Sequence, residues 1–134
     1  MMTQNDLAML AIPALNDMHL EEILIINRLD KASRALEMDN TSAIMQELID
    51  HTTLHFSTED ALMKEAGFPD YDTHKAEHDR HIHELKTWKK YFEKMKDPKA
   101  VWIHIEGNLE KWTQHHIQTM DTEMALFLEK SSSN

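Results

Sequence analysis

The sequence predicts an all-α protein, an antiparallel up-down-up-down four-helix bundle with a metal site in its core. Two observations support this. The 134-residue chain has only two glycines and three prolines, and apolar residues recur along it at spacings of three and four. Most of its ten histidines lie on the same apolar stripes, in a chain without cysteine. A chain of this length is expected to form one domain, residues 1–134.

Helix-breaking residues divide the chain into four segments. Gly67 and Pro69 interrupt the middle, and Asp97-Pro98 interrupts it again, because Asp favours the N-cap and Pro the first helical position. The cap and turn formers at 39–42 mark the remaining joint. We therefore expect helices over residues 17–38, 42–65, 70–96 and 99–128, and helices of similar length with short joints form a bundle.

Each of these segments carries histidine on its apolar stripe. The stripes are His19, Ile23 and Ile26 in the first; Ile44, Leu48, His51, His55, Glu59 and Leu62 in the second; Tyr71, His74, His78, His81, Leu85, Trp88, Phe92 and Met95 in the third; and Val101, Ile105, Leu109, Trp112, His116 and Met120 in the fourth. A single histidine on such a stripe is usually a hydrogen-bonded core residue. Several imidazoles on four converging faces are hard to satisfy that way, whereas a metal satisfies many at once.

The composition limits the other functions. The net charge of −10 argues against nucleic-acid binding, which needs a basic face, and against an electrostatic membrane anchor. The absence of cysteine excludes disulfides and thiolate sites. No segment approaches transmembrane length and the N-terminus lacks a basic region before its apolar run, so we expect a cytoplasmic protein.

The order and spacing of the ligand types resemble those of the hemerythrin family. The matching segments are NDMH (16–19), HFSTE (55–59), HKAEH (74–78) and HIQTMD (116–121), one per predicted helix. The stretch EDALMKEAGFPDYDTHKAEHD is similar to bacterial single-domain hemerythrins, and the likeness covers about residues 10–128. Neither the HExxH motif of zinc proteases nor the Glu-x-x-His pairs of ferritin-like di-iron bundles fits.

The resemblance implies an oxo- or hydroxo-bridged centre of two iron ions per chain that binds O2 reversibly. One iron would take His74, His78 and His116, the other His19 and His55, with Glu59 and Asp121 bridging both. Nitrogen and oxygen ligands of this kind suit iron. Counting one solvent-derived bridge, the second iron keeps an open position where O2 would bind.

Three further residues are expected around the O2 pocket. Trp112, one turn before His116, would shield the metals or simply fill the core. His81 stands where the family often has phenylalanine, and Thr113 where it usually has an aliphatic residue, so both bring polar atoms to a normally apolar pocket.

His116 and Asp121 pose a geometric difficulty. Residues five apart on an α-helix lie about 140° from each other, so they do not share a face. We expect either a π-type widening near Thr119 or an Asp121 side chain that reaches in from the flank of the stripe.

Three functions follow. The leading one is O2 binding for storage or delivery. The second is a sensor that acts through a separate, unidentified protein partner. The third is a di-iron peroxidase or oxidase, which His81 and Thr113 would favour. Binding without turnover is the simpler expectation, because the sequence offers no further acid, base or substrate pocket.

Overall fold

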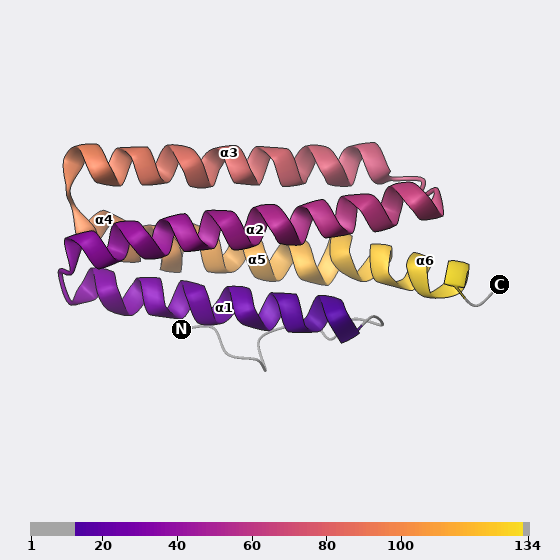
Figure 1. The fold of residues 1–134 in the computed structure, drawn as a ribbon, viewed down its shortest axis with the longest axis horizontal. Coiled ribbons are helices and arrows are strands. Elements are labelled where there is room, and N and C mark those ends of the chain that lie inside the picture. The colour runs from indigo at the N-terminus through magenta and orange to yellow at the C-terminus, as the bar shows by residue number, and fades with distance from the viewer. Residues whose placement is uncertain (1–12, 133–134) are drawn as a thin grey trace.

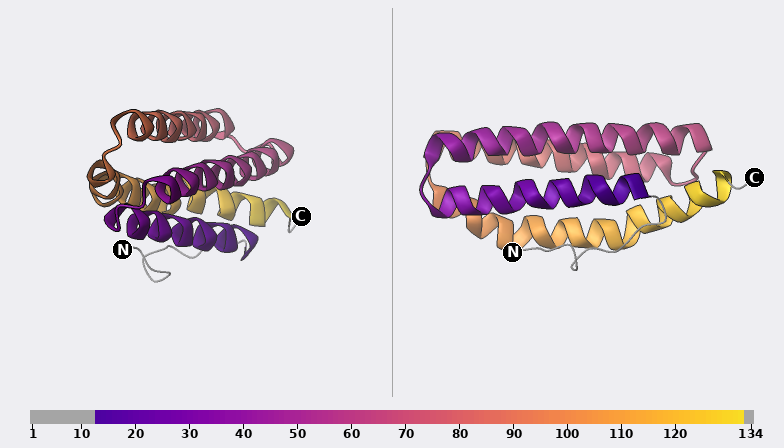
Figure 2. Two further views of the ribbon diagram at one scale, coloured as in Figure 1. Left: turned by 60° about the vertical axis from the view of Figure 1, so that its left-hand side comes forward. Right: turned by 60° about the horizontal axis from the view of Figure 1, so that its bottom comes forward.

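The computed structural model of the protein describes residues 13–132, and they form the four-helix bundle that the sequence predicts (Figure 1). Neighbouring helices run antiparallel, and α2 lies between α1 and α3 in the view of Figure 1. Two further views show the fourth rod completing the bundle beside α1 (Figure 2). The elements are α1 (Pro13–Arg34), α2 (Met38–Ala66), α3 (Tyr71–Met95) and a fourth rod made of α4 (Pro98–His104), η2 (Ile105–Leu109), α5 (Glu110–His116), η3 (Ile117–Asp121) and α6 (Thr122–Ser132).

The joint between α1 and α2 lies earlier than predicted, so the expected boundaries at 38 and 42 were wrong. Leu36 adopts a left-handed conformation, with φ of 60°. Its N–H donates to the Ser33 carbonyl at 3.1 Å and the Glu37 N–H donates to the Ala32 carbonyl at 3.1 Å, which is a Schellman motif. Glycine usually occupies this position, so the leucine at position 36 did not indicate the end of a helix. The predicted joint at 39–42 belongs to the first turns of α2 instead.

The other two joints lie close to the predicted positions. Gly67, with φ of 69°, closes α2 by the same motif, and the Phe68 N–H donates to the Met63 carbonyl at 2.9 Å. The Asp97 side chain caps α4 by accepting from the Lys99 N–H at 3.1 Å, with Pro98 as the first helical residue. These caps fix the ends of α2 and the start of the fourth rod.

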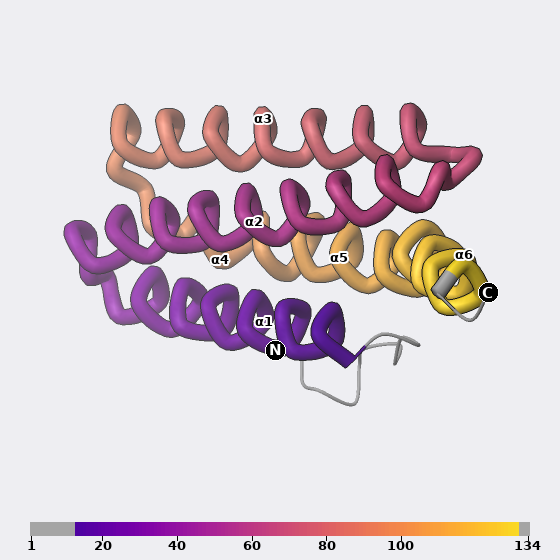
Figure 3. The backbone as a smooth tube through the Cα atoms, turned by 45° about the vertical axis from the view of Figure 1, so that its right-hand side comes forward, coloured from indigo at the N-terminus to yellow at the C-terminus, as the bar shows by residue number. Residues whose placement is uncertain are grey.

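The fourth rod is a single helix interrupted by two π-helical segments, η2 and η3. The widening expected near Thr119 is confirmed, because η3 spans Ile117–Asp121. The η2 segment was not predicted. Figure 3 shows α6 turned away from the line of α5, as is common where a π segment interrupts a helix.

The described core has two apolar clusters. One joins α1, α2, α3 and the start of the fourth rod, and it includes Leu29, Met45, Leu48, Phe92 and Ile105. The other joins the start of α1, the end of α2 and α6, and it includes Leu15, Met63, Phe68, Met124 and Leu128. None of the described helices has a stretch apolar and long enough to cross a membrane.

Candidate metal centre

The seven predicted ligands converge inside the bundle. All four rods contribute: His19 from α1, His55 and Glu59 from α2, His74 and His78 from α3, and His116 and Asp121 from the fourth rod. Each side chain is at most 4% exposed. Nitrogen and oxygen atoms of Glu59, His74, His78, His116 and Asp121 lie within 4.8 Å of one another, and the same holds for His19, His55 and Glu59.

Glu59 presents one carboxylate oxygen to each group of histidines. Its Oε2 lies 2.6 Å from His55 Nε2 and 3.7 Å from His19 Nε2. Its Oε1 lies 3.1 Å from His78 Nε2 and 3.8 Å from His74 Nε2. This arrangement is what a carboxylate shared between two metals requires.

Asp121 makes the same division from the opposite side. Its Oδ1 lies 3.0 Å from both His74 Nε2 and His116 Nε2, and its Oδ2 lies 3.2 Å from His19 Nε2. The side chain reaches this position because η3 has more residues per turn than a regular α-helix, which brings His116 and Asp121, five residues apart, closer to one face. The π segment therefore has a direct role in shaping the site.

The unsatisfied atoms fit a metal site. Among the described residues, buried atoms without a hydrogen-bonding partner include Nε2 of His19, His78 and His116, Oε1 of Glu59 and Oδ2 of Asp121. Two ligands bound at right angles about 2.1 Å from one metal lie about 3 Å apart. Many of the nitrogen-to-oxygen distances above are close to that value. Imidazole and carboxylate form a donor set suited to iron and related divalent ions.

Electrostatics link the histidines to the carboxylates. Burial lowers the pKa of His19, but the Asp121 and Glu59 carboxylates more than offset that and raise it to about 9. Burial also lowers the pKa of His55, which Glu22 and Glu59 raise well above its ordinary value. The pKa of Asp121 falls well below its ordinary value despite burial, because the imidazoles of His116, His19 and His74 lie beside its carboxylate. Without metal, protons therefore supply positive charge that metal ions would replace.

Two carboxylates that the sequence did not indicate contact the Nδ1 atoms of two candidate ligand histidines. Asp60 Oδ1 lies 2.8 Å from His78 Nδ1, and Glu22 Oε1 lies 3.3 Å from His55 Nδ1. Bonding at Nδ1 leaves Nε2 of each ring free to bind a metal. Glu22 follows His19 by three residues and Asp60 follows Glu59 directly. Their short sequence distance from a candidate ligand is the feature by which the sequence could have indicated them.

Two of the three predicted pocket residues, Trp112 and His81, stack in line with the candidate ligand His116. The Trp112 ring is stacked on His81 at 3.6 Å and on His116 at 4.6 Å between ring centroids. Its Nε1–H donates to Glu77 Oε1 at 3.0 Å. His81 and Thr113 are 5% and 4% exposed, so both polar side chains are enclosed. Burial lowers the pKa of His81 to about 4, so this imidazole is neutral at pH 7.

Comparison with known proteins identifies the family to which this arrangement belongs. The family model described as "Hemerythrin HHE cation binding domain" matches residues 10–128. A bacteriohemerythrin of Aquifex aeolicus is 30% identical over 111 residues, covering 83% of this chain and 85% of the relative. A bacteriohemerythrin of Pseudomonas aeruginosa is 28% identical over 110 residues, covering 82% and 70%. A hemerythrin of Phascolopsis gouldii is 31% identical over 86 residues, covering 64% and 63%.

Proposed function

The chain belongs to the hemerythrin family, and from that premise we propose that it binds O2 reversibly at a centre of two iron ions. The observation that carries the proposal is the division of the Glu59 and Asp121 oxygens between two groups of buried histidines. If the site held a single metal, each carboxylate would not need to present one oxygen to each of the two groups of histidines.

In this proposal the two irons have different surroundings. Three imidazoles, those of His74, His78 and His116, would hold one iron. Two, those of His19 and His55, would hold the other. The second iron has one imidazole fewer, so it keeps room for an incoming ligand. When bound, the two irons would supply the electrons that O2 needs to bind reversibly.

The protein's own residues would control access to that position. The stacked rings of His81, Trp112 and His116 exclude bulk water from one side of the centre. The Glu77 contact holds the Trp112 indole in place from the surface side. Asp60 and Glu22 orient two of the ligand rings through their Nδ1 atoms.

The test is an anaerobic reconstitution followed by an O2 titration. Metal-free protein is given ferrous iron, and the bound iron is measured per chain. We expect two irons, and an absorption band that appears with O2 and disappears when O2 is removed. One iron or none per chain, or a spectrum that does not reverse, contradicts the proposal. His55→Ala should retain less iron than a matched change of exposed His83→Ala.

An enzyme that reduces O2 or peroxide is the second candidate. The burial of His81, and of Thr113 one turn before His116, favours it, because their polar atoms could hold water or donate a proton to a bound ligand. The same titration separates the two functions. Continued O2 consumption in the presence of a reductant supports an enzyme, whereas a single reversible uptake per centre supports a carrier. In this titration a sensor would show the same reversible O2 uptake as a carrier, and it would in addition change its contacts with a protein partner.

A further inference from the structure

Glu22 is a buried carboxylate that is not one of the seven candidate metal ligands. It lies on α1, one turn after His19, and is 6% exposed. Its Oε1 accepts a hydrogen bond from the Thr52 hydroxyl at 3.0 Å and lies 3.3 Å from His55 Nδ1. Among the described residues, its only ion-pair partner is the His55 imidazole. An enclosed anion without a lysine or arginine partner is costly, so its position calls for an explanation.

We propose that Glu22 is a positioning residue that orients His55 for the second iron and, as a fixed negative charge, favours the oxidised form of the centre. This proposal rests on the iron centre proposed above. It has two parts, a hydrogen bond and a charge, and different substitutions separate them.

The hydrogen bond selects the useful form of the ring. An imidazole that donates its Nδ1–H to Glu22 has the Nε2 lone pair free, and Nε2 is the atom that faces Glu59 and the centre. Thr52, on α2 one turn before His55, donates to the same oxygen and so holds the carboxylate in place. Partners of this kind commonly change metal affinity 10- to 100-fold.

The charge acts on the metals once they are bound. A ligand histidine is neutral on a metal, so the positive charge that balances Glu22 must then come from the irons. Oxidation adds positive charge to the centre, and a nearby buried anion favours that change. Glu22 contacts a ligand of the iron with the open position, so the effect is greatest where O2 would bind.

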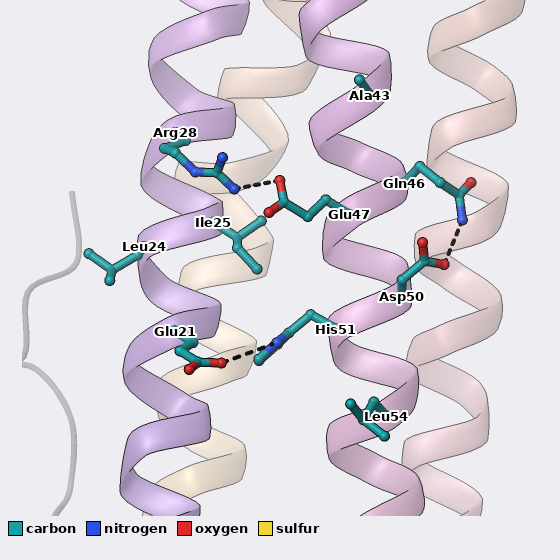
Figure 4. Close-up of a pocket in the computed structure, with 10 residues that line it drawn as sticks. All are labelled: Glu21, Leu24, Ile25, Arg28, Ala43, Gln46, Glu47, Asp50, His51 and Leu54. Atoms are coloured by element: carbon teal, nitrogen blue, oxygen red, sulfur yellow. Dashed lines mark hydrogen bonds and ion pairs between the residues drawn. The ribbon is translucent and has the colours of Figure 1, made fainter.

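Glu21 provides a matched control. It is the preceding residue and carries the same charge, but it faces outward into the groove between α1 and α2, where its Oε2 lies 3.8 Å from His51 Nδ1 (Figure 4). Its side chain is 68% exposed, so water screens its charge. Glu21→Gln and Glu22→Gln therefore make the same chemical change on the two sides of one helix.

The experiment compares Glu22→Gln, Glu22→Leu and Glu21→Gln after anaerobic loading with ferrous iron. Glutamine can still accept both hydrogen bonds, so Glu22→Gln should bind two irons, with the ratio of oxidised to reduced centre at a fixed potential lowered on the order of tenfold. Glu22→Leu should in addition need about 10- to 100-fold more free iron to fill its second site. Glu21→Gln should stay within about twofold of the unsubstituted protein in both measurements.

Equal shifts for Glu22→Gln and Glu21→Gln would overturn the charge part, and normal iron affinity in Glu22→Leu would overturn the positioning part. A metal-free measurement separates this proposal from the proposed function. In the metal-free chain, NMR should detect a slowly exchanging His55 Nδ1–H that is lost in Glu22→Leu and retained in Glu21→Gln. If the unsubstituted protein binds no iron pair, the proposed function and the charge part fail together, and this signal alone decides whether Glu22 orients His55.

Discussion

At the scale of single residues, Thr113 and His81 distinguish this centre from one enclosed by apolar groups. Thr113 precedes the candidate ligand His116 by three residues and is buried with it. A hydroxyl in such a place can hold a water molecule or donate a hydrogen bond, whereas an aliphatic side chain can do neither. In the proposed O2 carrier, the lifetime of bound O2 would depend on whether a proton can reach it, so the effect of this hydroxyl can be tested directly.

Replacing Thr113 by leucine should slow the irreversible oxidation of the oxygenated protein. The expected decrease in rate is roughly fivefold, the size of one lost hydrogen bond of about 1 kcal/mol. The measurement is the decay of the oxygenated absorption band at fixed pH and temperature. Thr87→Leu, on the exposed side of α3, should leave the rate unchanged. Unchanged or faster decay in Thr113→Leu would assign the control of proton access to His81 instead.

Iron uptake should release protons. Without metal, the pKa of His19 is raised to about 9, so its ring is protonated at pH 7.5, and the pKa of His55 is raised in the same direction. A protonated ring must become neutral to bind a metal, so at least one proton per chain should leave at that pH. Calorimetric titration with ferrous iron in two buffers of different ionisation enthalpy measures this number. It should fall as the pH rises through about 9, where His19 is already losing its proton; a release that does not vary between pH 7 and 10 contradicts this assignment.

The sequence indicated the seven candidate ligands because their types and spacings form a recognisable order. It did not indicate Glu22, because the pair Glu21-Glu22 reads as part of a solvated acidic surface in a chain of net charge −10. Only the rotation of α1 against α2 decides which of the two carboxylates turns inward. That rotation depends on the packing of the whole bundle, so a pattern within one helix cannot supply it.

At the scale of helices, the joints differ in how far sequence could locate them. Gly67, Asp97 and Pro98 have strong local preferences, and their joints lie close to the predicted positions. Leu36 occupies a left-handed position against its own preference, and the boundary there was missed. The η3 segment was predictable because two functional residues five apart had to share a face. The η2 segment contains no pair of candidate ligands that must share a face, so the sequence did not indicate it.

The two glycines should respond to alanine in opposite directions. Gly67 has φ of 69°, a conformation that strains any residue with a Cβ, so Gly67→Ala should destabilise the protein by about 1 kcal/mol. Gly107, in η2, has no left-handed φ, and no packing neighbour lies within 4 Å of the position that an alanine Cβ would take. Gly107→Ala should therefore stabilise the protein by about 0.5–1 kcal/mol. Urea unfolding of the metal-free forms measures both. A loss of stability in Gly107→Ala would show that η2 needs glycine for its own geometry.

At the scale of the whole molecule, a buried polar layer separates two apolar clusters. The clusters lie towards opposite ends of the bundle, and the candidate ligands lie between them. Metal binding joins side chains from all four rods, so it should stabilise the fold as well as create the site. In the metal-free protein, the same layer is held by ion pairs between protonated histidines and carboxylates. The two forms should therefore respond differently to pH.

The metal-free protein should lose stability as the pH rises from about 6.5 to above 9. The pKa of His19 is about 9 in the folded chain against 6.5 for an unperturbed histidine, so its contribution is complete below pH 6.5 and disappears as the pH passes 9. The full loss amounts to about 3 kcal/mol, and His55 changes in the same direction. His81 acts in the opposite sense but only below pH 6.5, because its folded pKa is about 4.

Urea unfolding at a series of pH values tests this expectation on metal-free and iron-loaded protein. Histidines bound to iron are already neutral and do not titrate over this range, and higher pH removes the protons that compete with the metal, so the loaded form should keep or gain stability. Metal-free His19→Asn should show a smaller loss than the unsubstituted chain, and His83→Asn, on the exposed side of α3, the same loss. A parallel decline in the metal-free and loaded forms would mean that the buried ion pairs do not hold the polar layer, and that the loss of stability arises elsewhere in the chain.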